Sequence, residues 1–143
     1  MVDVSGKRDV LRAAVAKGRI QLKPATIHLI KEQKIAKGDV FSLSRVAGIL
    51  SAKKTSDIIP LCHPLPLSAV DVSLRIVDES HIEVNAEVKA LAKTGVEMEA
   101  LVAVSTALLT IWDMTKQYEK DPEGQYPTTL IDGIQVTRKV KRE

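Results

Sequence analysis

Aromatic residues are scarce in this sequence of 143 residues. They make up 3% of the chain, against 45% for hydrophobic residues of all kinds. The four aromatic residues are Phe41, Trp112, Tyr118 and Tyr126. Residues 1–143 therefore suit one globular domain whose core is built from Val, Ile, Leu and Ala. The scarcity of aromatic residues argues against an RNA-binding sheet surface, which needs exposed aromatic rings on which bases stack.

Cysteine and histidine are also rare. Cys62 is the single cysteine, and the chain has three histidines. No disulfide can form within the chain, and a structural zinc site of the usual Cys/His kind would need ligands from several chains. The N-terminus has no apolar signal core, and the longest uncharged run, residues 100–112, has 13 residues where a bilayer span needs roughly 20. We therefore expect a cytoplasmic protein with no metal site and no membrane partner.

The excess of positive charge is concentrated at one end. The net charge is +3, and residues 136–143 account for all of it with four Lys or Arg and one Glu. The pI near 9.0 therefore reflects a basic C-terminal tail from about residue 136, which we expect to be solvated, and implies no nucleic-acid partner. The common phosphate-loop, dinucleotide, zinc-protease and serine-hydrolase motifs are absent as well.

Apolar periodicity predicts four strands and three helices. The strands span residues 12–23, 70–77, 82–89 and 134–140, and the helices span residues 24–34, 40–53 and 96–120. Segment 55–66 contains three prolines and predicts a stiff loop. This order of elements predicts an α+β fold of the ferredoxin-like type, in which helices pack on one face of an antiparallel sheet.

The predicted helix 40–53 has clear local signals. Asp39 is a potential N-cap at its start. Five apolar residues then repeat at helical spacing, which places them on one face of the helix: Val40, Leu43, Val46, Ala47 and Leu50.

The predicted helix 96–120 carries polar residues at both ends. Asp113 and Lys116 are neighbours at i, i+3, so this pair can act as proton acceptor and donor or be an ordinary exposed ion pair. Glu99 faces the same side as Asp113, but about 21 Å separates them along the helix axis. One small substrate therefore cannot touch both residues in the same chain.

Two further positions have polar residues of interest. His63 lies in a proline-rich loop, which can hold an imidazole in place at low entropic cost. Lys53 and Lys54 end the helix 40–53, where the helix dipole favours lysine whether or not an anion binds. The residues alone predict a small, oligomeric α+β domain with lysines able to bind an anion.

Three stretches together resemble one enzyme family. They are MVDVSGK at residues 1–7, segment 37–68 with KGDVF and IPLCHPL, and segment 93–116 with GVEMEAL and DM-x-K. Over nearly its whole length the chain is similar to the cyclic pyranopterin monophosphate synthases of molybdenum-cofactor biosynthesis. The resemblance implies a lyase that converts (8S)-3′,8-cyclo-7,8-dihydroguanosine 5′-triphosphate to cyclic pyranopterin monophosphate and releases pyrophosphate.

The resemblance also assigns roles to individual residues. The family's catalytic positions fall on Asp113, Lys116 and Lys37. Its substrate-binding positions fall on Leu61, Cys62, His63, Met98, Glu99, Lys53 and Arg12. Thr115 stands where some members have cysteine, and Ser56 stands where an aromatic residue can occur. Cationic side chains are expected in such a site, because a triphosphate carries about four negative charges.

The resemblance implies partners as well. It implies a small-molecule triphosphate substrate and a homo-oligomer, namely a hexamer built as a trimer of dimers, with sites between subunits. It implies no tightly bound cofactor, and it leaves open whether magnesium accompanies the substrate triphosphate. The rival interpretation is a non-catalytic ferredoxin-like nucleotide-binding module, which the fold alone does not separate from the enzyme.

Overall fold

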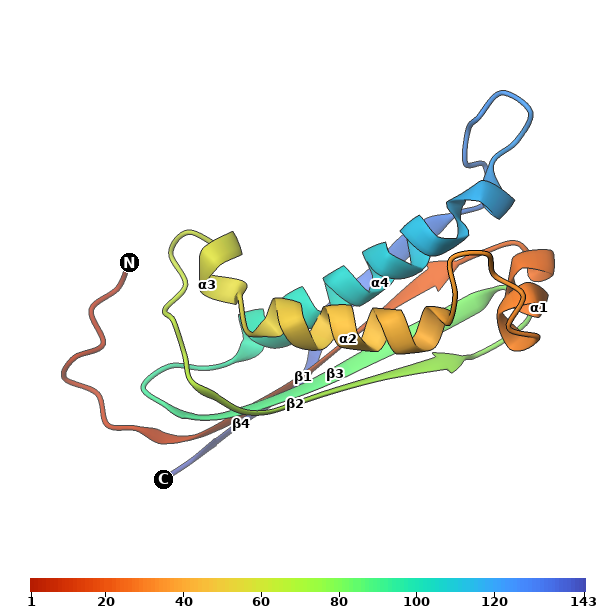
Figure 1. Ribbon diagram of the computed structural model, residues 1–143. Coiled ribbons are helices and arrows are strands. Elements are labelled where there is room, and N and C mark those ends of the chain that lie inside the picture. The colour runs from red at the N-terminus through yellow and green to blue at the C-terminus, as the bar shows by residue number, and fades with distance from the viewer.

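The fold is an open four-stranded sheet covered by helices on one side. A computed structural model describes residues 1–143. Its elements are β1 (Val10–Gln21), α1 (Pro24–Lys31), α2 (Val40–Ala52), α3 (Thr55–Ile58), β2 (Leu67–Ile76), β3 (His81–Ala92), α4 (Glu97–Glu119) and β4 (Leu130–Arg142). The strands pair antiparallel in the order β2-β3-β1-β4. Figure 1 shows α2 and α4 on the same side of the sheet, α1 at one end and both termini at the other. The predicted ferredoxin-like α+β fold is confirmed.

The first strand has the predicted alternation. Ala14, Ala16 and Ile20 on its inner face are at most 1% exposed. Gly18 on the same face lies close to α4, because a Cβ at this position would be only 2.8 Å from the side chain of Leu108. Small residues in the middle of β1 therefore let the helix layer pack directly on the sheet.

Helix α1 begins at Pro24, as predicted, but ends at Lys31 rather than at residue 34. Gln33 has a φ of 55°, and this left-handed conformation is incompatible with continuing the helix. An exposed loop, residues 32–39, then leads to α2. Asp39 caps α2 as predicted, since its carboxylate accepts a hydrogen bond from the backbone N–H of Ser42 at 3.1 Å.

The buried face of α2 differs from its apolar stripe. Leu43, Val46 and Leu50 are 50–54% exposed, whereas small residues such as Ser44 and Gly48 face the core. A Cβ at Gly48 would be 3.0 Å from the carbonyl oxygen of Ala103 on α4, so only a very small residue permits this approach. Close packing of α2 on α4 therefore selects the small-residue face and leaves Leu43, Val46 and Leu50 of the apolar stripe exposed, whereas Val40 at its start is buried.

The proline-rich segment 55–66 is not a loop throughout. It begins with the four-residue helix α3, which the sequence pattern did not predict. The buried hydroxyl of Thr55 donates to the carbonyl oxygen of Ala52 at 2.9 Å. This hydrogen bond connects the start of α3 to the last residue of α2. Beyond α3 the segment has no helix or strand until β2.

Helix α4 matches the predicted helix 96–120 to within one residue at each end. It is long and apolar enough to cross a membrane by length and composition, with a mean hydropathy of 1.3 over its most apolar window, but 56% of that window is buried inside the protein. The helix contacts β1, β3 and α2. We therefore interpret α4 as the central helix of the core.

The last turn of α4 carries a fully buried carboxylate. Glu119 is 0% exposed and accepts hydrogen bonds from the backbone N–H of Lys23, from the hydroxyl of Thr26 and, at 2.8 Å, from the hydroxyl of Thr129. These donors belong to the start of α1 and to the residue before β4. Glu119 thereby joins three elements at one end of the molecule.

Strand β4 is longer than the predicted edge strand 134–140 and includes the basic C-terminal residues. It pairs with β1 from Leu130 to Arg142, so this segment is an ordered strand rather than a solvated end. Lys139 makes an ion pair of 2.5 Å with Glu97 at the start of α4. Most side chains from residue 136 onward remain exposed.

Candidate active site

Three charged residues of the predicted catalytic set meet at the C-terminal half of α4. Lys37, from the loop 32–39, places its Nζ 2.9 Å from Asp113 Oδ2 and 3.1 Å from the Asp113 carbonyl oxygen. Lys116 Nζ lies 2.9 Å from Asp113 Oδ1. Each carboxylate oxygen of Asp113 therefore accepts from a different ammonium group. The pairing of Asp113 with Lys116 was expected from their spacing, whereas the contact with Lys37 depends on the fold.

This arrangement sets the charge of each member. Hydrogen bonds from Lys116 and then from Lys37 lower the pKa of Asp113 below its ordinary value. The hydrogen bond to Asp113 and its negative charge raise the pKa of Lys116. At neutral pH Asp113 is a carboxylate and Lys116 an ammonium, so in the free protein Asp113 can only accept a proton and Lys116 can only donate one.

Two aromatic rings lie beside this cluster. The centroids of Trp112 and Tyr126 are 5.3 Å apart, with the rings tilted by 54°. The hollow next to them has a volume of about 490 Å³ and is lined by Leu109, Trp112, Asp113, Lys116, Tyr126 and Ile131. No pattern in the sequence indicates a role for these two rings, although two of the chain's four aromatic residues lie here. They offer an apolar wall for a flat heterocycle.

A second cluster lies at the other end of α4. Five residues predicted to bind substrate line one depression of about 380 Å³, namely Leu61, Cys62, His63, Met98 and Glu99. The first three come from the proline-rich segment, and Met98 and Glu99 come from the first turn of α4. His63 Nε2 lies 2.7 Å from the carbonyl oxygen of Val2, so the N-terminal segment also contacts this cluster.

The second cluster contains a buried acid and a neutral thiol. Glu99 is 4% exposed, and burial, followed by the nearby charge of Glu97, raises its pKa. Burial and the charge of Glu99 also raise the pKa of the Cys62 thiol. Cys62 is therefore not activated as a nucleophile, since a reactive cysteine needs a lowered pKa.

Lys53 and Arg12 line neither depression. Lys53 is the exposed C-cap residue of α2. Arg12 donates from its guanidinium to the carbonyl oxygens of Ala92 and Lys93, at 3.5 and 3.2 Å. It lines a separate basic depression with Lys7, Arg8, Val10, Lys141 and Glu143. Within one chain, the predicted site residues therefore lie in several separate places.

The two clusters at the ends of α4 have no lining residue in common. Glu99 lies in the first turn of α4 and Asp113 in its second half, consistent with the axial separation of about 21 Å expected from the helix rise. Within a single chain, each cluster is therefore a separate surface feature.

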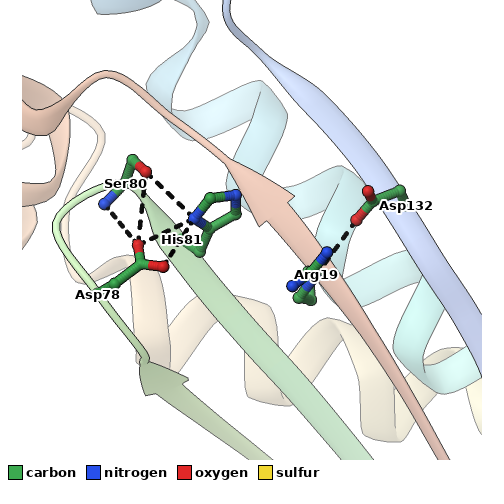
Figure 2. Close-up of polar contacts among 5 residues, drawn as sticks. All are labelled: Arg19, Asp78, Ser80, His81 and Asp132. Carbon is green, nitrogen blue, oxygen red and sulfur yellow. Dashed lines mark hydrogen bonds and ion pairs between the residues drawn. The ribbon is translucent and has the colours of Figure 1, made fainter.

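A further polar group at the β2–β3 turn has the residue types of a catalytic triad. Figure 2 shows that Asp78 and Ser80 both contact His81, with Arg19 and Asp132 paired separately across β1 and β4. Both contacts reach the same ring atom, His81 Nδ1, at 2.9 Å from Asp78 Oδ1 and 3.1 Å from Ser80 Oγ. A triad needs the base to contact its two partners through different nitrogens, so this group is a turn-stabilising cluster.

Few side chains in this site are available as metal ligands. Asp113 is the single carboxylate of its cluster, and lysines occupy both of its oxygens. No group of three or more His, Cys, Asp or Glu side chains lies together in a geometry that could hold a metal ion.

Comparison with known proteins gives a consistent result. The model of the MoaC family matches residues 1–141. A probable cyclic pyranopterin monophosphate synthase of Pyrococcus furiosus is 59% identical over 143 residues, which cover 100% of this chain and 91% of that protein. Its counterpart in Saccharolobus solfataricus is 55% identical over 143 residues, covering 100% of this chain and 95% of the relative. The chain therefore belongs to the MoaC family.

Proposed function

We propose that this protein is a cyclic pyranopterin monophosphate synthase of molybdenum-cofactor biosynthesis. It converts (8S)-3′,8-cyclo-7,8-dihydroguanosine 5′-triphosphate to cyclic pyranopterin monophosphate and releases pyrophosphate. The observation that carries this proposal is the Asp113 carboxylate held between Lys37 and Lys116, in a chain that belongs to the MoaC family.

The charges of this cluster suit the chemistry. A hydroxyl that attacks the α-phosphorus must lose a proton, and the ionised Asp113 is able to accept it. The departing pyrophosphate gains negative charge, which Lys37 and Lys116 are able to stabilise. Substrate phosphates would draw both ammonium groups away from Asp113 and so leave its carboxylate free to act as a base.

The second cluster would bind the remainder of the substrate. Leu61, Cys62 and His63 supply an apolar and hydrogen-bonding wall, and Glu99 supplies a carboxyl group whose raised pKa suits hydrogen bonding to a heterocycle. Lys53 and Arg12 would add cationic contacts to the phosphates. These roles are part of the proposal.

We also propose that the enzyme is a homo-oligomer, a hexamer built from dimers, with sites between subunits. Two observations support this assembly. The two clusters are separate in one chain, so an antiparallel partner is needed to bring Glu99 of one subunit beside Asp113 of another. In addition, Leu43, Val46 and Leu50 form an exposed apolar stripe along α2, which a second copy would cover.

Other components of the proposal concern cofactor and compartment. The enzyme would need no tightly bound cofactor. Magnesium, where it takes part, would arrive with the substrate's phosphates, since lysines already occupy both oxygens of Asp113. The reaction would take place in the cytoplasm.

The test is turnover by the purified protein. Incubation with the cyclic dihydroguanosine triphosphate should release pyrophosphate and form cyclic pyranopterin monophosphate in equal amounts. Lys37→Ala should lower the rate by at least about 10²-fold because a phosphate-stabilising cation is lost. Lys34→Ala is the matched control, because Lys34 lies in the same exposed loop but pairs with Glu32.

Two results would contradict the proposal. Nucleotide binding without pyrophosphate release would favour the non-catalytic binding module. Wild-type turnover in Lys37→Ala would show that Lys37 does not act on the substrate's phosphates.

A further inference from the structure

Lys37 belongs to a mostly exposed loop whose backbone makes few hydrogen bonds to the rest of the fold. The loop 32–39 is exposed except for Ile35, and it includes Gln33 and Gly38 with φ values of 55° and 113°. Its backbone-to-backbone hydrogen bonds are all local, to α1, to the start of α2 and within the loop, such as Gly38 N–H to the carbonyl of Ile35 at 3.0 Å. Apart from the side chain of Ile35, which is buried in the core, contacts with other elements therefore have to hold Lys37 in register with Asp113.

Tyr118 provides one direct connection. Its hydroxyl accepts a hydrogen bond of 2.8 Å from the backbone N–H of Ala36, the residue immediately before Lys37. This is the one hydrogen bond between the backbone of loop 32–39 and α4. The ring of Tyr118 is partly buried against the hydrophobic core, so its hydroxyl is presented from a well-anchored side chain.

The position of Tyr118 on α4 makes this contact relevant to the site. Tyr118 follows Lys116 by two residues and lies five residues, about 1.4 turns, beyond Asp113. The contact therefore couples the main chain next to Lys37 to the same helix segment that carries the other two charged groups. A lysine side chain is long and flexible, so the placement of its backbone decides how often Nζ reaches the carboxylate.

We propose that Tyr118 is a positioning residue, which holds the loop 32–39 so that Lys37 is aligned with Asp113 and Lys116. This inference rests on the proposed function, because it assigns Tyr118 to the same site. Misplacement of a catalytic group by about 1 Å costs up to about 10²-fold in rate, so a single hydrogen bond at this point affects turnover.

The variant that tests the proposal is Tyr118→Phe. It removes the hydroxyl and keeps the ring. Because Ala36 is exposed, water can accept the hydrogen bond that its backbone N–H donates to Tyr118 in the wild type. The melting temperature should fall by less than about 5 °C. We expect kcat to fall about 5- to 30-fold, with KM changed by less than about threefold. Hydrogen–deuterium exchange, read by mass spectrometry, should become faster in residues 32–39 and stay unchanged in α2.

Ser105→Ala is the matched control. Its hydroxyl donates to the carbonyl oxygen of Leu101 within α4 at 2.8 Å, far from the loop 32–39. This variant also removes one hydroxyl from the same helix, and it should leave both kcat and the exchange of residues 32–39 as in the wild type.

The outcomes separate this inference from the proposed function. Wild-type kcat in Tyr118→Phe overturns the inference whether or not exchange in residues 32–39 becomes faster. A lower kcat with unchanged exchange also overturns it, because Tyr118 would then act by another route. If wild-type protein shows no turnover, or if Lys37→Ala keeps full activity, the proposed function fails instead. The exchange measurement still shows whether Tyr118 holds the loop.

Discussion

At the scale of single residues, Asp113 combines exposure with strong electrostatic control. Its side chain is 57% exposed, yet Lys37 and Lys116 keep it ionised. Asp113→Asn preserves the shape but removes the titratable group. We predict a loss of about 10²–10⁴-fold in kcat with a nearly unchanged KM, because the proposed proton acceptor is lost while the lysines proposed to bind phosphate remain. Steady-state kinetics and thermal melts of both proteins check this, and a kcat within tenfold of wild type would contradict it.

Glu99 poses the opposite electrostatic problem, because burial raises its pKa in the folded protein. Because the pKa is raised, the folded state loses stability as the pH rises above the ordinary glutamate pKa of 4.5, and this loss is complete once the pH exceeds the raised pKa. Glu99→Gln should therefore increase the free energy of unfolding by about 1 kcal/mol at neutral pH, while activity falls. This gain in the free energy of unfolding should vanish below pH 4.5, the ordinary pKa of glutamate, because the wild-type side chain is protonated there. Urea unfolding at both pH values measures this, and an equal gain at both would contradict the burial argument.

His63 is predicted to orient substrate rather than to support the fold. Its ring is partly exposed and has one hydrogen-bond partner, the carbonyl oxygen of Val2. His63→Ala should therefore lower kcat/KM by more than about tenfold while the melting temperature falls by only a few degrees. A large drop in melting temperature with normal activity per folded molecule would instead indicate a structural imidazole.

At the scale of elements, the last turn of α4 holds one end of the molecule together. Glu119→Ala would leave the buried hydroxyls of Thr26 and Thr129 and the partly buried backbone N–H of Lys23 without an acceptor. We predict a loss of about 2–4 kcal/mol in the free energy of unfolding, and a smaller loss for Glu119→Gln, whose amide oxygen keeps part of the network. Chemical denaturation measures both.

Glu123→Ala serves as the control for these two variants, because Glu123 is exposed and its side chain has no partner. A loss below about 0.5 kcal/mol in Glu119→Ala, no greater than a typical surface substitution, would show that the Glu119 network contributes nothing to stability.

The elements also show what sequence patterns can predict. Alternation predicted the strands because one face of the sheet is buried and the other is not, as Ala16 in β1 illustrates. The same reasoning did not identify the packing face of α2. Most of its apolar stripe beyond Val40 is exposed, because the close approach of Gly48 to α4 requires small side chains that carry no hydrophobic signal. Helix α3 was missed because four residues are too few to establish a period.

At the scale of the whole molecule, α4 presents two polar clusters at its two ends. Helix geometry predicted that Glu99 and Asp113 lie too far apart to share a small substrate within one chain. It did not predict the contact of Lys37 with Asp113 or the aromatic wall of Trp112 and Tyr126. Both depend on connecting segments that fold back on α4, and their paths depend on tertiary packing rather than on local spacing.

The most direct test of the shared site is complementation between two inactive variants. Asp113→Asn subunits are mixed with Glu99→Gln subunits, and exchange is verified by native mass spectrometry. We predict that pyrophosphate release recovers, because some sites then combine an intact Glu99 from one chain with an intact Asp113 from another. A mixture of Asp113→Asn with Lys116→Ala, whose defects lie in the same cluster, should stay inactive. No recovery in the first mixture, despite confirmed exchange, would show that Glu99 and Asp113 of the same chain serve one site and would contradict a site shared between subunits.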